Sequence, residues 1–85
     1  MTDLQPEFER AVAASKTLPE KPDNATLLKL YALFKQSTEG DATGERPGFS
    51  DFVGRAKWDA WHGLAGTSRQ DAMRRYIDLV EDLGA

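Results

Sequence analysis

Apolar residues recur every three or four positions along most of this chain, which is the spacing of helices that bury one face. The first such stretch covers about residues 2–15, and its narrow apolar stripe consists of Leu4, Phe8, Ala11 and Val12, with Ser15 at its end. The last stretch begins at Thr67 or Ser68 and has the cleanest stripe, made of Met73, Tyr76, Ile77, Val80 and Leu83. Both stretches predict amphipathic helices that pack against a core.

The second predicted helix is apolar on more than one side. It opens at Asp23 or Asn24, both good N-terminal caps, and it ends at Gly40. One of its faces carries Leu27, Leu30, Tyr31 and Phe34, and its other face adds Leu28 and Leu33.

A third helix is predicted from Phe52 or Val53 to His62. We expect Phe49 to pack in front of it as a hydrophobic staple, and Gly63 to take the left-handed position at its end.

The remaining signals are a loop and a helix start. Residues 40–48 are polar and rich in glycine, which predicts a loop, and Asp71 follows Ser68 by three residues, as in a capping box. Since no segment alternates as a strand does, the predicted fold is an all-α four-helix bundle.

Composition limits the class of protein. At 85 residues the chain is expected to form one domain over residues 1–85, and without cysteine it has neither disulfides nor thiolate metal ligands. The single histidine, His62, suits a helix end, so we expect no transition-metal site. The acidic N-terminus lacks a signal-peptide pattern, and no segment approaches the roughly eighteen apolar residues of a membrane span. We expect a soluble, cytoplasmic protein without stable membrane insertion.

Charge argues against nucleic-acid binding, because the net charge is −3. Trp58 and Trp61 could form a stacking platform for single strands, but the acidic balance and the intervening Asp59 favour core packing. The basic residues within or next to the aromatic segments are Lys16, Lys35, Arg55 and Lys57. They indicate a local cationic spot that is compatible with a small anionic ligand.

Tyr31 and Lys35 are four residues apart on the second predicted helix, so they project from the same face. Aromatic rings beside fixed cations suit a flat, anionic ligand such as a nucleotide. Spacing alone, however, favours a tyrosine at the core edge with a snorkelling lysine, and it leaves Lys57 an ordinary surface residue and Tyr76 a core residue.

The order of residues carries more information than their spacing. Four segments stand out: Tyr31-Ala32-Leu33-Phe34-Lys35-Gln36-Ser37-Thr38-Glu39-Gly40-Asp41, Arg46-Pro47-Gly48, Lys57-Trp58-Asp59-Ala60-Trp61, and Asp71-Ala72-Met73 leading to Tyr76-Ile77. In these segments, and from near Phe8 to about Leu83, the chain closely resembles the acyl-CoA-binding protein family. The resemblance implies helices arranged up, down, down, up, with the ligand in an open bowl between them.

The resemblance also implies roles for single residues. Tyr31, Lys35 and Lys57 would converge on the 3′-phosphate of coenzyme A, and Lys16 would reach the phosphates or the carbonyl region. Phe34 stands where the family usually has tyrosine, so its ring could stack on adenine without a polar contact. Tyr76 would pack beside the ligand.

The function implied is reversible binding of medium- to long-chain fatty acyl-CoA by an intracellular carrier and pool buffer, with no other cofactor and as a monomer. A helical protein-interaction module that holds an amphipathic partner helix is the alternative; it would explain the second helix but not the positions of the tyrosine and lysines. An enzyme such as a thioesterase is not expected, because no serine has an evident base and no carboxylate has an apolar setting.

Overall fold

The structure, a computed structural model, describes residues 3–84 and contains four helices within them. These are α1 (Gln5–Ser15), α2 (Asn24–Glu39), α3 (Phe52–His62) and α4 (Arg69–Asp82). The described residues contain no strand, so the prediction of an all-α fold is confirmed. The first helix begins later than predicted, at Gln5, and the predicted start at Thr2 lies outside the described residues.

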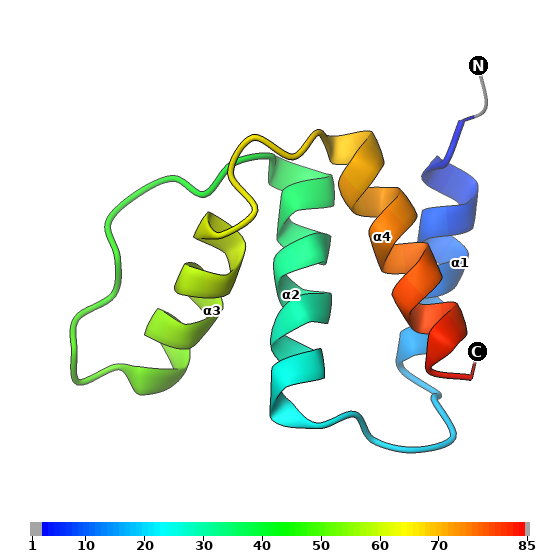
Figure 1. Cartoon of the computed structure of the whole chain (residues 1–85), viewed down its shortest axis with the longest axis horizontal. Coiled ribbons are helices and arrows are strands. Elements are labelled where there is room, and N and C mark those ends of the chain that lie inside the picture. Colours follow the sequence, from blue (N-terminus) through cyan, green and yellow to red (C-terminus); the bar gives the residue numbers. More distant parts are fainter. Residues whose placement is uncertain (1–2, 85) are drawn as a thin grey trace.

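The helices run in the predicted order of up, down, down, up (Figure 1). The connection from Gly40 to Asp51 runs along the length of α3 before that helix begins, so α3 lies parallel to α2. Helix α4 then returns in the direction of α1.

Helix α2 is the central element. It packs against α4 on one side and against α3 on the other, whereas α1 packs against α4. This arrangement accounts for the apolar residues on more than one side of α2, and its buried residues are Leu30, Ala32, Leu33, Gln36 and Ser37.

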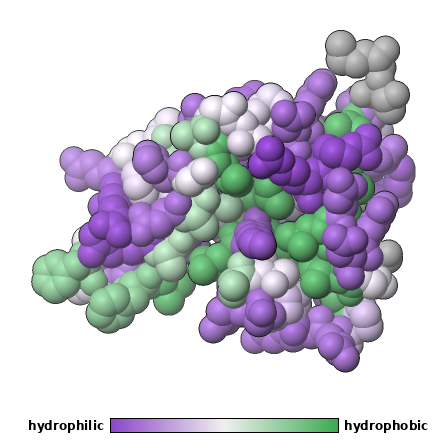
Figure 2. Space-filling view, in the orientation of Figure 1, coloured by the Kyte–Doolittle hydropathy of each residue, from purple (hydrophilic) through white to green (hydrophobic). Residues whose placement is uncertain are grey.

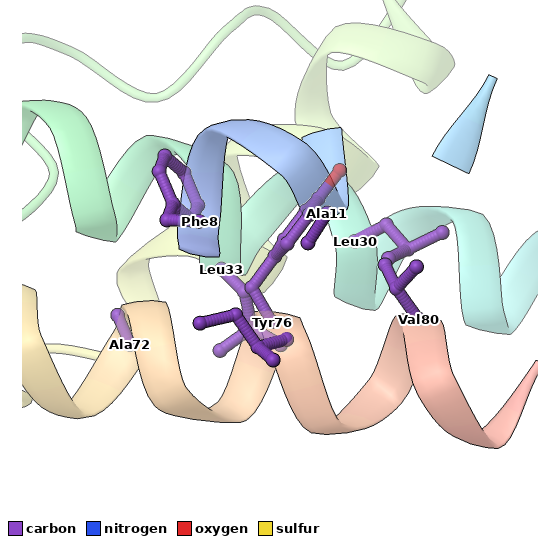
Figure 3. Packing of buried hydrophobic residues seen from close by; sticks show 8 residues of the cluster. Phe8, Ala11, Leu30, Leu33, Ala72, Tyr76 and Val80 are labelled. Atoms are coloured by element: carbon purple, nitrogen blue, oxygen red, sulfur yellow. The ribbon is translucent and has the colours of Figure 1, made fainter. Parts of the chain in front are cut away.

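The hydrophobic core lies between α1, α2 and α4 (Figure 3). The ring of Phe8 links α1 to the other two helices, because it contacts Tyr76 of α4 edge-on with centroids 5.2 Å apart and stacks on Phe34 of α2 at 6.0 Å. The buried members of this core are Phe8, Ala11, Leu30, Leu33, Ala72, Tyr76, Ile77 and Val80. Helix α3 contributes none of them, so its position depends on contacts with α2 and with the connections.

The helix starts follow the predicted capping chemistry. The Asp23 carboxylate accepts from the Thr26 N–H at 2.8 Å, and the Ser68 hydroxyl accepts from the Asp71 N–H at 3.0 Å. Gly40 ends α2 with a φ of 81°, a conformation that favours glycine.

Two predictions around α3 are wrong. Gly63 has a right-handed φ of −63°, because the backbone continues in tight turns after α3, and Gly66 with a φ of 87° takes the left-handed position instead. Phe49 is 78% exposed and does not act as a staple. The turn closed by the Asp51 N–H and the Gly48 carbonyl lies directly before α3, and the cap of the helix is the Asp51 carboxylate, which accepts from Gly54.

A polar network around the buried Gln36 side chain joins the end of α2 to the connection between α3 and α4. The Gln36 side chain is fully buried, and its amide donates to the Asp41 carboxylate at 2.8 Å and to the Thr67 carbonyl at 2.7 Å. The same carboxylate accepts from the Gly66 N–H at 3.0 Å. The Gln36 amide and the Gly66 N–H lower the pKa of Asp41, so this carboxylate stays charged at neutral pH.

We predict that Gln36→Leu lowers the free energy of unfolding by about 1–3 kcal/mol, because it leaves the Thr67 carbonyl without its donor and removes one of the two donors to the Asp41 carboxylate. Urea unfolding would measure the loss. Gln5→Leu is the matched control, since Gln5 is exposed on α1, and it should change stability little. Equal stability of the Gln36 variant and the wild type would contradict this role for the network.

Candidate ligand-binding site

Lys57 and Tyr31 meet across the interface between α3 and α2. The Lys57 ammonium lies over the Tyr31 ring, 5.3 Å from its centroid. Tyr31 is partly exposed and Lys57 is exposed, so both the ring and the charge can be reached from solvent. The structure thus brings together two of the predicted site residues from separate helices.

Lys35 lies one turn further along α2 and has other neighbours. Its ammonium is 4.9 Å from the centroid of the Trp61 ring, and it forms an ion pair with the Glu39 carboxylate. Trp61 is buried, as predicted, and its indole N–H donates to the Gly40 carbonyl at 2.7 Å. The buried indole therefore positions a ring face for Lys35, a role that the sequence did not suggest.

An apolar groove of about 430 Å³ lies between α2 and α3, with Lys57 on its wall. The other lining residues are Asn24, Leu27, Leu28, Phe52, Val53 and Ala56. Figure 2 shows hydrophobic atoms along the edge where α3 begins, at the lower left. Phe52 and Val53 are largely exposed there, so the groove is an open surface that a hydrocarbon chain could cover.

The remaining predicted site residues have different settings. Phe34 is 37% exposed, and one side of its ring is stacked on Phe8. Tyr76 is buried in the core, and its hydroxyl is 3.1 Å from the Ser15 hydroxyl. Lys16 is exposed in the turn that follows α1.

A second surface hollow, of about 350 Å³, lies between α1 and α4. Its walls are Glu7, Arg10, Ala11, Ala14, Ile77, Val80 and Glu81. Two carboxylates and one guanidinium line it, and no aromatic residue does, so it is less suited to a flat anion than the groove beside Lys57.

Further residues hold the site in place, and the sequence reasoning missed them. Both oxygens of the Asp59 carboxylate accept from the Arg46 guanidinium, at 2.8 and 2.7 Å, which fastens the long connection to α3. This donor lowers the pKa of Asp59. The Trp58 indole N–H also reaches the Thr43 carbonyl at 3.4 Å. Arg46 and Asp59 both lie in the motifs quoted above, but spacing could not pair them across a loop.

Among residues 3–84 no group of three or more His, Cys, Asp or Glu side chains could hold a metal ion. In the same part of the chain, no helix has the length and apolar character needed to cross a membrane. What the site offers is cations over aromatic faces next to an apolar groove, a combination that suits an amphiphilic anion.

Comparison with known proteins gives a consistent result. The family model described as acyl-CoA-binding protein matches residues 5–80. Acyl-CoA-binding protein homolog 1 of Caenorhabditis elegans is 51% identical over 76 residues, which are 89% of this chain and 88% of the homolog. Enoyl-CoA delta isomerase 2 of Rattus norvegicus is 45% identical over the whole chain, but the match covers only 22% of that longer protein.

A solved structure agrees with these sequence matches. The crystal structure of acyl-CoA-binding protein 2 from Oryza sativa superposes with a TM-score of 0.91 at 44% sequence identity, and the match covers 95% of this chain and 90% of the rice chain. The fold, the family model and a relative of similar length thus agree, and the chain belongs to the acyl-CoA-binding protein family.

Proposed function

We propose that this protein binds medium- to long-chain fatty acyl-CoA thioesters reversibly and serves as an intracellular carrier and pool buffer in lipid metabolism. The observation that carries the proposal is the Lys57 ammonium held over the Tyr31 ring on the wall of an apolar groove. A cation on the wall of an apolar groove, with an aromatic ring beneath it, matches a ligand with a nucleotide head and a hydrocarbon tail. Membership of the family supports the same ligand.

The head group would lie where α2 and α3 meet. Tyr31, Lys35 and Lys57 would contact the 3′-phosphate, with each charge-assisted hydrogen bond contributing roughly 1.5–3 kcal/mol. The outer face of Phe34 would stack on the adenine, and its ring, lacking a hydroxyl, can offer no hydrogen bond.

Lys16 and Tyr76 have supporting roles in this proposal. Lys16 would approach the phosphates or the thioester carbonyl from the end of α1. Tyr76 is buried against Phe8, so it would shape the floor beneath the ligand through the Phe8–Phe34 stack.

The acyl chain would lie in the groove lined by Leu27, Leu28 and Val53. Each buried methylene contributes about 0.8 kcal/mol, so a chain of several carbons adds as much as the phosphates do. The exposed apolar residues at the start of α3 would then be covered in the complex.

In this proposal the chain is a binding protein that has no cofactor and no catalytic activity and acts as a cytoplasmic monomer. One relative is an isomerase, but this chain matches only about a fifth of that protein's length, so the isomerase activity is not part of the proposed function. A module that binds an amphipathic helix would also use the groove, yet it gives no reason for a cation held over the ring of Tyr31.

We predict that each added methylene tightens binding by up to about fourfold until the groove is filled. Calorimetry with a series from octanoyl-CoA to palmitoyl-CoA would measure the trend, with free palmitate as the control for the head group. Equal affinity across the series would contradict the acyl groove. Equal affinity of palmitate and palmitoyl-CoA would contradict the nucleotide site.

We predict that Lys57→Ala weakens palmitoyl-CoA binding by about 1.5–3 kcal/mol and leaves thermal stability nearly unchanged, because this exposed ammonium gains its anionic partner only in the complex. The loss should be smaller with the 3′-dephospho ester. Lys29→Ala is the matched control, since Lys29 is an exposed residue of α2 outside the groove. A loss as large for Lys29→Ala would mean that general charge, and not this site, determines affinity.

A further inference from the structure

Lys35 and Lys57, the two lysines proposed to bind the 3′-phosphate, have different neighbours in the free protein. The Lys57 ammonium lies over the Tyr31 ring, whereas the Lys35 ammonium is already paired with a carboxylate, that of Glu39. The Lys35 side chain keeps only 23% of its surface exposed, and the Trp61 ring lies 4.9 Å from its ammonium. The Lys35 ammonium therefore already has a carboxylate partner in the free protein.

The position of Glu39 follows from the end of α2. Glu39 is four residues after Lys35, the spacing at which oppositely charged side chains pair on a helix. Its carbonyl accepts from the Arg69 guanidinium at 3.3 Å, and Gly40 terminates the helix directly after it. Because its backbone is tied to α4, Glu39 stays within reach of Lys35.

The Glu39 carboxylate and a ligand phosphate would compete for the Lys35 ammonium, and they differ in negative charge. Glu39 carries one negative charge, whereas a phosphate monoester carries about −1.5 to −2 at neutral pH and offers three acceptor oxygens. A dianionic phosphate can thus displace Glu39 from the Lys35 ammonium, whereas an uncharged hydroxyl cannot. A partly exposed pair at this spacing is weak, worth up to about a factor of five in an equilibrium constant, so displacement is feasible.

We propose that Glu39 is an internal counterion that holds Lys35 in the free protein and lowers its affinity for a terminal phosphate. This inference rests on the proposed function and deepens it, since it concerns the same ligand. In the free protein Glu39 and Trp61 hold the Lys35 ammonium along the last turn of α2. On binding, the 3′-phosphate takes the ammonium from Glu39, and the cost of that exchange lowers affinity for every ligand that recruits Lys35.

Glu39→Gln tests the proposal, because it removes the charge and keeps the size of the side chain. Calorimetry should show palmitoyl-CoA binding about two- to fivefold more tightly, with less than about a twofold change for the 3′-dephospho ester. Asp78→Asn is the matched control, since Asp78 is an exposed acid of α4 and its loss changes the net charge equally. It should leave both affinities unchanged.

A double-mutant cycle with Lys35→Ala separates action through Lys35 from simple repulsion of the ligand. In the Lys35→Ala background, Glu39→Gln should no longer tighten binding. The proposal is overturned if Glu39→Gln gives no gain, if it gains equally with the dephospho ester, or if the gain persists without Lys35. A wild-type protein that binds no acyl-CoA would instead reject the proposed function, and this inference with it.

Discussion

The amide of Gln36 donates from a fully buried position to the Asp41 carboxylate and to the Thr67 carbonyl. Asp41 begins the connection from α2 to α3, and Thr67 lies near the end of the connection from α3 to α4. The Gln36 side chain therefore holds one end of each connection that flanks α3. Within the described residues, helix α3 contributes nothing to the buried hydrophobic cluster, and α2 is the one helix that it packs against. The site between α2 and α3 therefore depends on polar contacts that lie outside it.

This arrangement separates stability from binding. The face of α2 toward α4 and α1 holds the core, and the face toward α3 carries Tyr31 and Lys35, which are both partly exposed. The Arg46–Asp59 pair and the contact of Trp58 with Thr43 tie the long connection to α3. Apolar residues can then stay uncovered at the start of α3, because the folded state does not need their burial.

The helices and their caps were predictable because the signals are local. The Asp23 and Ser68 caps each act within three residues, and the apolar stripes of α1 and α4 are read directly from their spacing. The failures at Phe49 and Gly63 have one cause: the chain around α3 is shaped by turns that cannot be recognised from residue type alone.

The site was predictable only in part. The resemblance selected Tyr31, Lys35 and Lys57, and the structure brings Lys57 to Tyr31. Spacing could not show that Lys35 would lie over Trp61, because that contact joins residues from two helices. The Gln36 network spans 31 residues in sequence between Gln36 and Thr67, and a glutamine within an apolar helix gives no sign of its partner. Polar contacts between residues far apart in sequence can be identified only once the three-dimensional structure is known.

The central claim is that the ligand lies between α2 and α3, over Tyr31 and along the groove, and not between α1 and α4. Amide chemical shifts of the isotope-labelled protein, followed during titration with palmitoyl-CoA, test it most directly. We predict the largest changes at Tyr31, Lys57 and Val53, with little change at Arg10 and Glu81 in the opposite hollow. The largest changes at Arg10 and Glu81, with Tyr31 and Lys57 unaffected, would contradict the account.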